Sequence, residues 1–212
     1  MKITLFTFNP FAENTYLLEG DNKECIIVDP GMVNGKEEQE LFDHIEQKGL
    51  TPIRLVNTHC HIDHVLGFHA VYKKYGLEPE FTKEEQMVFE ACPRVAEMYG
   101  ISYLHYTGKT KVLDPKIRLE LGKEELEIRF VPGHAPGHIV MVDHTAGNVI
   151  AGDTLFNGSV GRTDLPGAVH DLLMKKIKSE LYTLPGNFKV WPGHGPETTI
   201  EKEKKTNPFV RA

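Results

Sequence analysis

The order of strand-like and helix-like segments predicts an α/β fold, a four-layer αββα sandwich in which two β-sheets stack and helices cover their outer faces. Two observations support this prediction. The chain of 212 residues runs twice through the same order of strands, helix, strand and helix, and two such halves stack most simply as two sheets with outer helices. Its composition, 40% apolar and 25% charged, is typical of a globular protein with one sizeable core. We therefore expect a single domain over residues 1–212.

Short runs rich in β-branched and aromatic residues open the first half and predict meandering strands. They cover residues 3–8, 14–18 and 25–29. A helix is expected over 36–49, because Leu41, Phe42 and Ile45 share one helical face and Gly49 stands where a C-terminal cap belongs. A strand and a second helix then follow, at residues 53–57 and 65–75.

The middle of the chain carries charges with apolar residues interspersed at helical spacing. This pattern covers residues 83–106, and Pro93 is expected to interrupt it, since proline removes a backbone hydrogen bond inside a helix. We expect a lid inserted at about residues 83–110. The second half then resumes with four strand candidates, a helix, a strand and a charged final helix: 116–121, 126–131, 139–143, 148–152, 171–182, 188–191 and the last turns of the chain.

Histidine and aspartate side chains follow the strands of both halves directly. Such residues are costly to bury, so a repeated position just past core strands needs a reason. The residues concerned are His59, His61, Asp63, His64, His134, Asp153 and His194. Imidazole and carboxylate ligands suit zinc, iron or manganese, and the absence of a cysteine partner argues against a closed structural zinc site. The pattern therefore predicts a pair of divalent metal ions, most simply Zn²⁺, with Fe or Mn as alternatives. His138 is left open between lining this site and supporting a ligand.

The motif HxHxDH, a later lone histidine, an aspartate after a strand and a final GHG resemble the metallo-β-lactamase fold superfamily over nearly the whole chain. Within it, the stretches GDTLFNGSVGRTDLPG and PGHGPETTIEKEKKTNPF are similar to the short bacterial form of the glyoxalase II-related hydrolases. The resemblance implies that His59, His61 and His134 hold the first metal and that Asp63, His64 and His194 hold the second. It implies that Asp153 bridges both.

The same resemblance implies a substrate contact at Arg162, where the family places a basic residue for glutathione. The aromatic residue expected after it is replaced by TDLPG, so the thiol carrier stays open. We expect a binuclear metallohydrolase that cleaves a thioester such as a hydroxyacylglutathione, with a metal-bound hydroxide as the nucleophile. Asp63 has the catalytic role of steering that hydroxide with its second carboxylate oxygen.

Two alternatives from other classes remain open at this point. One is a mononuclear iron persulfide dioxygenase, since two histidines and one carboxylate form the facial set that activates oxygen. The other is a non-catalytic metal-binding module. The stretch GRTDLPG favours the hydrolase.

Charge and hydropathy restrict the partners of the chain. A net charge of −6 without a dense Lys/Arg stripe disfavours a nucleic-acid partner. No apolar run is long enough to cross a membrane, and the start lacks the features of a secretory signal, so we expect a cytoplasmic protein with a small-molecule thioester or thiol-conjugate substrate. The three cysteines are too few for a disulfide framework and should be free thiols. The sequence makes no prediction of the oligomeric state.

Overall fold

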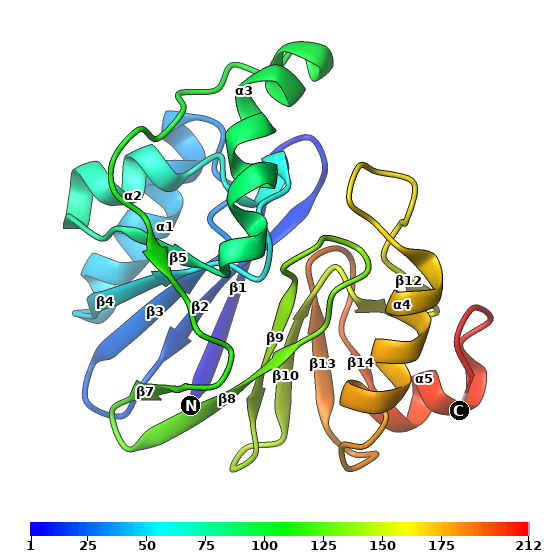
Figure 1. Cartoon of the computed structure of the whole chain (residues 1–212). Coiled ribbons are helices and arrows are strands. Elements are labelled where there is room, and N and C mark those ends of the chain that lie inside the picture. Colours follow the sequence, from blue (N-terminus) through cyan, green and yellow to red (C-terminus); the bar gives the residue numbers. More distant parts are fainter. Residues whose placement is uncertain (212) are drawn as a thin grey trace. The chain divides into compact units, whose positions relative to one another are not determined.

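The computed structural model describes residues 1–211, and the chain divides into two compact units (Figure 1). The first unit comprises Met1–Leu113 and Leu121–Glu124. The second comprises Asp114–Glu120 and the described residues from Glu125 onward. The two large sheets have six strands each.

The sheet of the first unit has the strand order β1-β2-β3-β4-β5-β6. Its strands are β1 (Lys2–Phe8), β2 (Glu13–Glu19), β3 (Glu24–Val28), β4 (Thr51–Val56), β5 (Pro79–Phe81) and β6 (Lys111–Val112). The first three strands pair antiparallel, whereas β3, β4, β5 and β6 pair parallel to one another. The carboxyl ends of parallel strands meet at one edge, and the segment that follows β4 there contains the HxHxDH motif.

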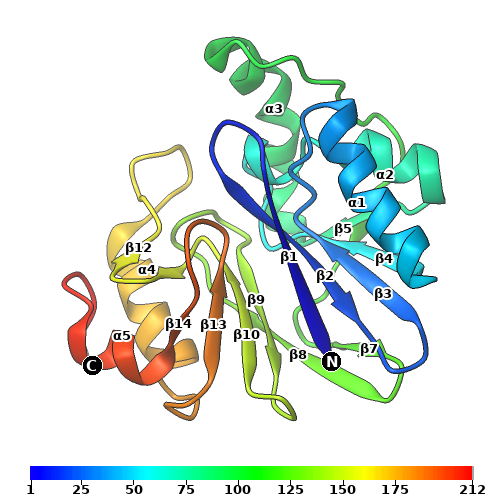
Figure 2. The same ribbon diagram turned by 180° about the vertical axis from the view of Figure 1, so that it is seen from behind.

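The helices of this unit are α1 (Gly35–Lys48), the 3₁₀ turn η1 (Ile62–His64), α2 (Phe68–Tyr75), the 3₁₀ turn η2 (Lys83–Glu85) and α3 (Gln86–Tyr99). Figure 2 shows α1 beside β3 and β4. It begins at an Asn34 cap, whose side chain accepts hydrogen bonds from two backbone N–H groups, and ends at Gly49 with φ of 59°. It buries the three apolar residues that the sequence placed on one face, Leu41, Phe42 and Ile45, so the prediction is confirmed.

Helix α3 differs from its prediction, because Pro93 lies inside a continuous helix and does not interrupt it. The reason is packing on both sides of the proline. Phe89, Cys92 and Ala96 are all buried in the core of the first unit, together with residues from β2, β3 and α2. Burial of this apolar stripe outweighs the backbone hydrogen bond that proline removes.

The second large sheet has the order β14-β13-β10-β9-β8-β7. Its strands are β7 (Arg118–Leu121), β8 (Glu124–Phe130), β9 (Ile139–Asp143), β10 (Asn148–Gly152), β13 (Lys189–Pro192) and β14 (Thr198–Thr199). The second unit also contains a hairpin of β11 (Leu155–Phe156) and β12 (Ser159–Val160), helix α4 (His170–Lys176), which continues into a π-helical turn η3 (Ile177–Leu181), and helix α5 (Ile200–Thr206). Leu173, Ile177, Leu181 and Ile200 pack on strand residues such as Val149 in one core.

Two sequence expectations concern the whole chain. The three cysteines are free, as expected, and all three are buried. Among residues 1–211, the structure contains no helix that combines the length and the apolar character required of a membrane span.

Candidate metal centre

The first ligand candidates lie on a loop that begins where β4 ends, and Asn57 gives this loop its shape. The buried Asn57 side chain donates from Nδ2 to the backbone oxygens of His59 (3.1 Å) and His64 (2.8 Å). These two bonds fold residues 57–64 back on themselves. The histidines of the motif lie together because the chain turns here. The ring centroids of His59 and His64 are 4.1 Å apart, and those of His59 and His61 are 4.8 Å apart.

Asp29, at the end of β3, fixes the orientation of this loop. Its Oδ1 accepts from the Thr58 backbone N–H (2.7 Å), and its Oδ2 accepts from the Thr58 hydroxyl (2.5 Å) and from Nδ1 of His64 (3.1 Å). The Thr58 hydroxyl also lies 3.0 Å from Nδ1 of His59. Because a carboxylate accepts, Nδ1 of His64 carries the hydrogen and Nε2 keeps the lone pair that a metal needs. Asp29 is not among the residues predicted from the sequence, although it too follows a core strand directly.

Glu13 is a second buried carboxylate at this loop that the sequence did not reveal. It is fully buried on β2, with Oε1 3.6 Å from Nδ1 of His64 and Oε2 accepting from the Thr15 hydroxyl (2.9 Å). Burial raises the pKa of Glu13 well above its usual value, and the neighbouring His64 opposes this only in part. A Cβ at Gly31 would lie 2.0 Å from Oε2 of Glu13 and 2.7 Å from the Asp63 backbone oxygen, so only glycine fits there.

Asp63 is held through its backbone. The Asn9 side chain donates from Nδ2 to the backbone oxygens of Gly31 (2.9 Å) and Asp63 (3.0 Å). Asn9 has φ of 53°, a left-handed conformation that asparagine tolerates better than most residues. The Asp63 side chain is only 14% exposed, and its Oδ2 lies 3.6 Å from Nε2 of His64. Carboxylate and imidazole therefore face each other as two ligands of one ion would.

In the second unit, His134 follows β8 and is held in one tautomer by a backbone carbonyl. Its Nδ1 donates to the Arg162 backbone oxygen at 2.7 Å, so Nε2 keeps the lone pair. Nε2 of His134 lies 3.5 Å from Oδ2 of Asp153. A Cβ at Gly161 would lie 1.9 Å from the Asp153 backbone oxygen and 3.0 Å from Nδ1 of His134, which explains the glycine before Arg162.

Asp153 lies between two histidines of this unit. It comes directly after β10, and its backbone N–H donates to Nε2 of the buried His138 at 3.0 Å. The His138 side chain therefore supports the backbone of a ligand candidate, which is one of the two roles that the sequence left open. Oδ2 of Asp153 lies 3.6 Å from Nε2 of His194 as well as 3.5 Å from Nε2 of His134. One oxygen of the Asp153 carboxylate thus lies beside both imidazoles.

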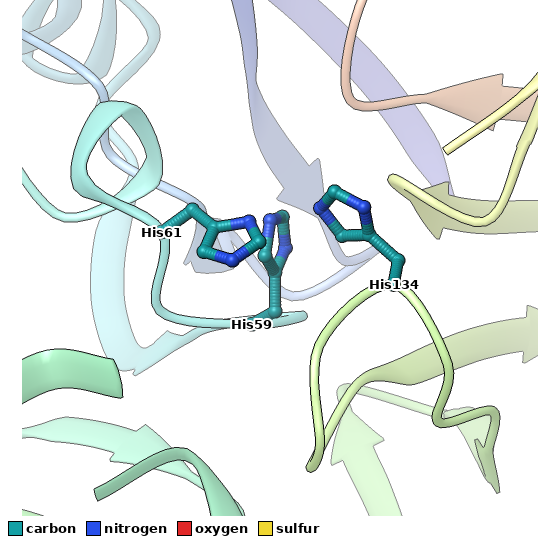
Figure 3. Close-up of side chains that lie close together, drawn as sticks. All are labelled: His59, His61 and His134. Carbon is teal, nitrogen blue, oxygen red and sulfur yellow. The ribbon is translucent and has the colours of Figure 1, made fainter. Parts of the chain in front are cut away.

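Three sets of His and Asp residues could hold a metal ion, because the ligand atoms within each set lie within 4.8 Å of one another. They are His59, His61 and His134 (Figure 3); Asp63, His64 and His194; and Asp29, His59 and His64. The first two sets contain the residues that the sequence analysis assigned to the two metals, whereas in the third Asp29 is a hydrogen-bond partner of His64. Imidazole nitrogens with defined tautomers and nearby carboxylates are the ligand chemistry of divalent zinc, iron or manganese.

Arg162 is already paired in this structure. Its guanidinium forms two hydrogen bonds to the Asp164 carboxylate, Nε to Oδ1 at 2.7 Å and Nη2 to Oδ2 at 2.9 Å, and both side chains are more than half exposed. These hydrogen bonds lower the pKa of Asp164 to about 2. An anionic substrate group that binds Arg162 would therefore compete with a neighbouring carboxylate.

The geometry agrees with the chain's similarity to known proteins. A family model described as the metallo-beta-lactamase superfamily matches residues 8–196. The chain is 34% identical to the probable metallo-hydrolase YqgX of Bacillus subtilis, with 99% of this chain and 98% of that protein covered. It is 32% identical to the hydroxyacylglutathione hydrolase GloC of Haemophilus influenzae, with 100% and 99% covered.

Solved structures give the same picture. The BLEG-1 B3 metallo-beta-lactamase has a TM-score of 0.90 and 29% identity, with both chains covered completely. The protein TTHA1623, solved in a di-iron-bound form, has a TM-score of 0.88 and 33% identity, with 98% of this chain and 100% of that chain covered. These likenesses confirm the predicted α/β fold class of the metallo-β-lactamase type.

Proposed function

This chain belongs to the metallo-beta-lactamase superfamily, whose fold is that of metal-dependent hydrolases, and we propose that it is a binuclear metallohydrolase that cleaves thioesters of small thiols. The observation that carries the proposal is the position of Asp153 Oδ2, 3.5 Å from His134 and 3.6 Å from His194, each of which belongs to a different ligand set. The relative named hydroxyacylglutathione hydrolase, similar over the full length, supports the thioester as the substrate class.

The proposal assigns each ligand candidate to an ion. His59, His61 and His134 would hold the first ion, and Asp63, His64 and His194 would hold the second. Asp153, whose Oδ2 lies near both His134 and His194, would contact both ions. When bound, two such ions lower the pKa of water towards neutrality and stabilise negative charge on an oxygen. The protein keeps the imidazoles ready for this task, since Asp29 and the Arg162 carbonyl hold His64 and His134 with Nε2 available.

Asp63 has the catalytic role in this proposal. One of its oxygens would serve as a ligand, and the other would orient the attacking hydroxide. The Asn9 bond to the Asp63 backbone oxygen restricts the direction in which that carboxylate can turn. The leaving thiol needs little help from an acid, because an ordinary thiol has a pKa of about 8.5 and departs readily as the thiolate.

Arg162 is the proposed contact for an anionic group of the thiol carrier. The guanidinium is exposed and bidentate towards Asp164, which is the geometry with which arginine binds any carboxylate. A carboxylate of the substrate would replace Asp164 at the same two nitrogens.

Thiol release from a panel of acyl thioesters that includes lactoylglutathione tests the proposal. Protein loaded with zinc, iron or manganese should release thiol, and His61→Ala, which removes one ligand, should lower that rate at least a hundredfold. Oxygen uptake with glutathione persulfide in place of thiol release would identify a dioxygenase instead. Stoichiometric metal binding without turnover in either assay would leave a binding module and refute the proposed function.

A further inference from the structure

Side chains of helix α3 and of the turn before it form hydrogen bonds with the backbone between two ligand candidates. Cys60 stands between His59 and His61 in the sequence. Its backbone N–H donates to Oε2 of Glu85 at 2.8 Å, and its backbone oxygen accepts from the Cys92 thiol at 3.3 Å. The backbone N–H and the backbone oxygen of Cys60 are thus both hydrogen-bonded to side chains from the segment 85–92, far away in the sequence.

The two side chains that form these hydrogen bonds lie on one face of the helix. Glu85 directly precedes α3, and Cys92 follows it by seven residues, which is close to two full helical turns. Glu85 is fully buried, Cys92 is 1% exposed and Cys60 is fully buried. Between them on the same face, Phe89 packs on Phe68 and Phe81 with ring centroids 5.5 Å away in each case. The position of α3 relative to Cys60 is therefore fixed by packing as well as by hydrogen bonds.

The location of this contact matters for the histidines on either side. In an extended segment, residues two apart point to the same side and the residue between them points to the other. His59 and His61 can therefore present their rings to one ion while the Cys60 side chain faces the core, where Cys92 lies. A rotation of either peptide group of Cys60 would turn both imidazoles away from their common direction.

Glu85 is a buried carboxylate, and a buried carboxylate is unfavourable unless it is well hydrogen-bonded. Glu85 meets that requirement at the Cys60 N–H. The Cys92 thiol remains a donor at neutral pH, since burial, together with Asp63 and Glu85, raises its pKa to about 12.

We propose that Glu85 and Cys92 are positioning residues, which hold the Cys60 peptide groups so that His59 and His61 bind the same metal ion. This inference rests on the proposed metal-binding role of these two histidines. The proposed role belongs to the segment that the sequence analysis predicts as a lid, and it does not depend on that prediction.

The test measures metal affinity and folding stability separately on stripped protein. Competition with a chromogenic chelator gives the affinity for Zn²⁺, and urea unfolding in the presence of chelator gives the stability of the metal-free chain. Glu85→Ala should weaken the binding of the more affected Zn²⁺ ion 10- to 100-fold, the range found when residues that orient metal ligands are removed. Glu85→Gln should stay within about threefold of the wild type, because its amide oxygen still accepts the Cys60 N–H. The matched control Glu84→Ala, an exposed neighbour, should leave the affinity unchanged.

Cys92→Ala and Cys92→Ser provide a second pair if Glu85→Ala does not fold. The alanine variant should weaken Zn²⁺ binding, and the serine variant, which restores a donor, should recover part of it. Wild-type affinity in Glu85→Ala or Cys92→Ala, with only a loss of stability, would overturn the inference and leave the two residues as core packing. A wild-type protein that binds no metal would refute the proposed function itself. A protein that binds metal but releases no thiol would refute the proposed thioester hydrolysis and leave this inference about metal binding standing.

Discussion

Replacing Asp29 by asparagine is the perturbation whose effect the structure defines most closely. The carboxylate is 1% exposed and accepts three hydrogen bonds, two from Thr58 and one from Nδ1 of His64. Asp29 also has φ of 50°, a left-handed conformation that asparagine adopts more readily than most residues. Asp29→Asn therefore changes the hydrogen bonding and leaves the backbone conformation intact.

The expected magnitude follows from the partners of each oxygen. The asparagine Oδ1 can still accept the Thr58 N–H, and the Thr58 hydroxyl can rotate to accept from the new amide. The imidazole N–H of His64, 3.1 Å away, then faces an amide donor. One charge-assisted hydrogen bond is lost, which is about 1.5–3 kcal/mol in the free energy of unfolding of metal-free protein. If His64 shifts its proton to Nε2 to escape this contact, the metal lone pair is lost as well, and affinity should fall 10- to 100-fold.

The assay compares wild type, Asp29→Asn and the control Asp171→Asn, which changes an exposed aspartate at the start of α4. Urea unfolding of stripped protein should show the loss of stability only in Asp29→Asn, with the control within about 0.5 kcal/mol of the wild type. Zn²⁺ titration should show the loss of affinity in the same variant. Two ions bound to Asp29→Asn with wild-type affinity would refute the reasoning that Asp29 sets the tautomer of His64.

Three further predictions follow from the site and the core. Asp153→Ala should lose bound metal and thioester cleavage together, as elemental analysis and thiol release would show; retention of both ions would remove its bridging role. Arg162→Ala should raise KM for an anionic thioester up to about fivefold with kcat unchanged, since exposed ion pairs contribute at most about 1 kcal/mol. Asp164→Asn, which removes the competing carboxylate, should lower that KM. An unchanged KM in both variants would refute the assignment of Arg162 as a substrate contact. Burial and then Glu19 raise the pKa of Cys25 from 9.0 to about 12, so its contribution to stability is complete below pH 9 and is lost between pH 9 and 12, because the unfolded thiol ionises first. The Tm difference between wild type and Cys25→Ala should therefore shrink as the pH rises from 8 to 11, and a constant difference would contradict it.

The sequence contained enough information to select the ligand candidates, because each one follows a core strand and the ends of neighbouring strands lie together. Tertiary partners leave no such pattern. Asp29 and Glu13 read as ordinary strand-end residues, and their contacts with His64 depend on the pairing of β2 with β3 and of β3 with β4. The pairing of Arg162 with Asp164 was equally hidden, although the two residues are only two positions apart.

The fold shows a similar division between regular and irregular segments. Segments with a clear pattern, such as the apolar strand at 139–143 and the amphipathic helix α1, matched their predictions, because the pattern extends over several residues. The strands β5, β6, β11, β12 and β14 have two or three residues each and were not predicted, since such short segments carry no alternation. Pro93 was interpreted as a break because local propensity cannot show the burial of Phe89, Cys92 and Ala96 around it.

Anomalous diffraction from crystals of metal-loaded protein would locate each ion without reference to activity, so it is the decisive measurement for the metal centre. We expect two peaks. One should be contacted by His59, His61 and His134 and the other by Asp63, His64 and His194, with Asp153 touching both. A single peak, or peaks that leave Asp153 without a metal contact, would contradict the binuclear centre on which the proposed chemistry depends.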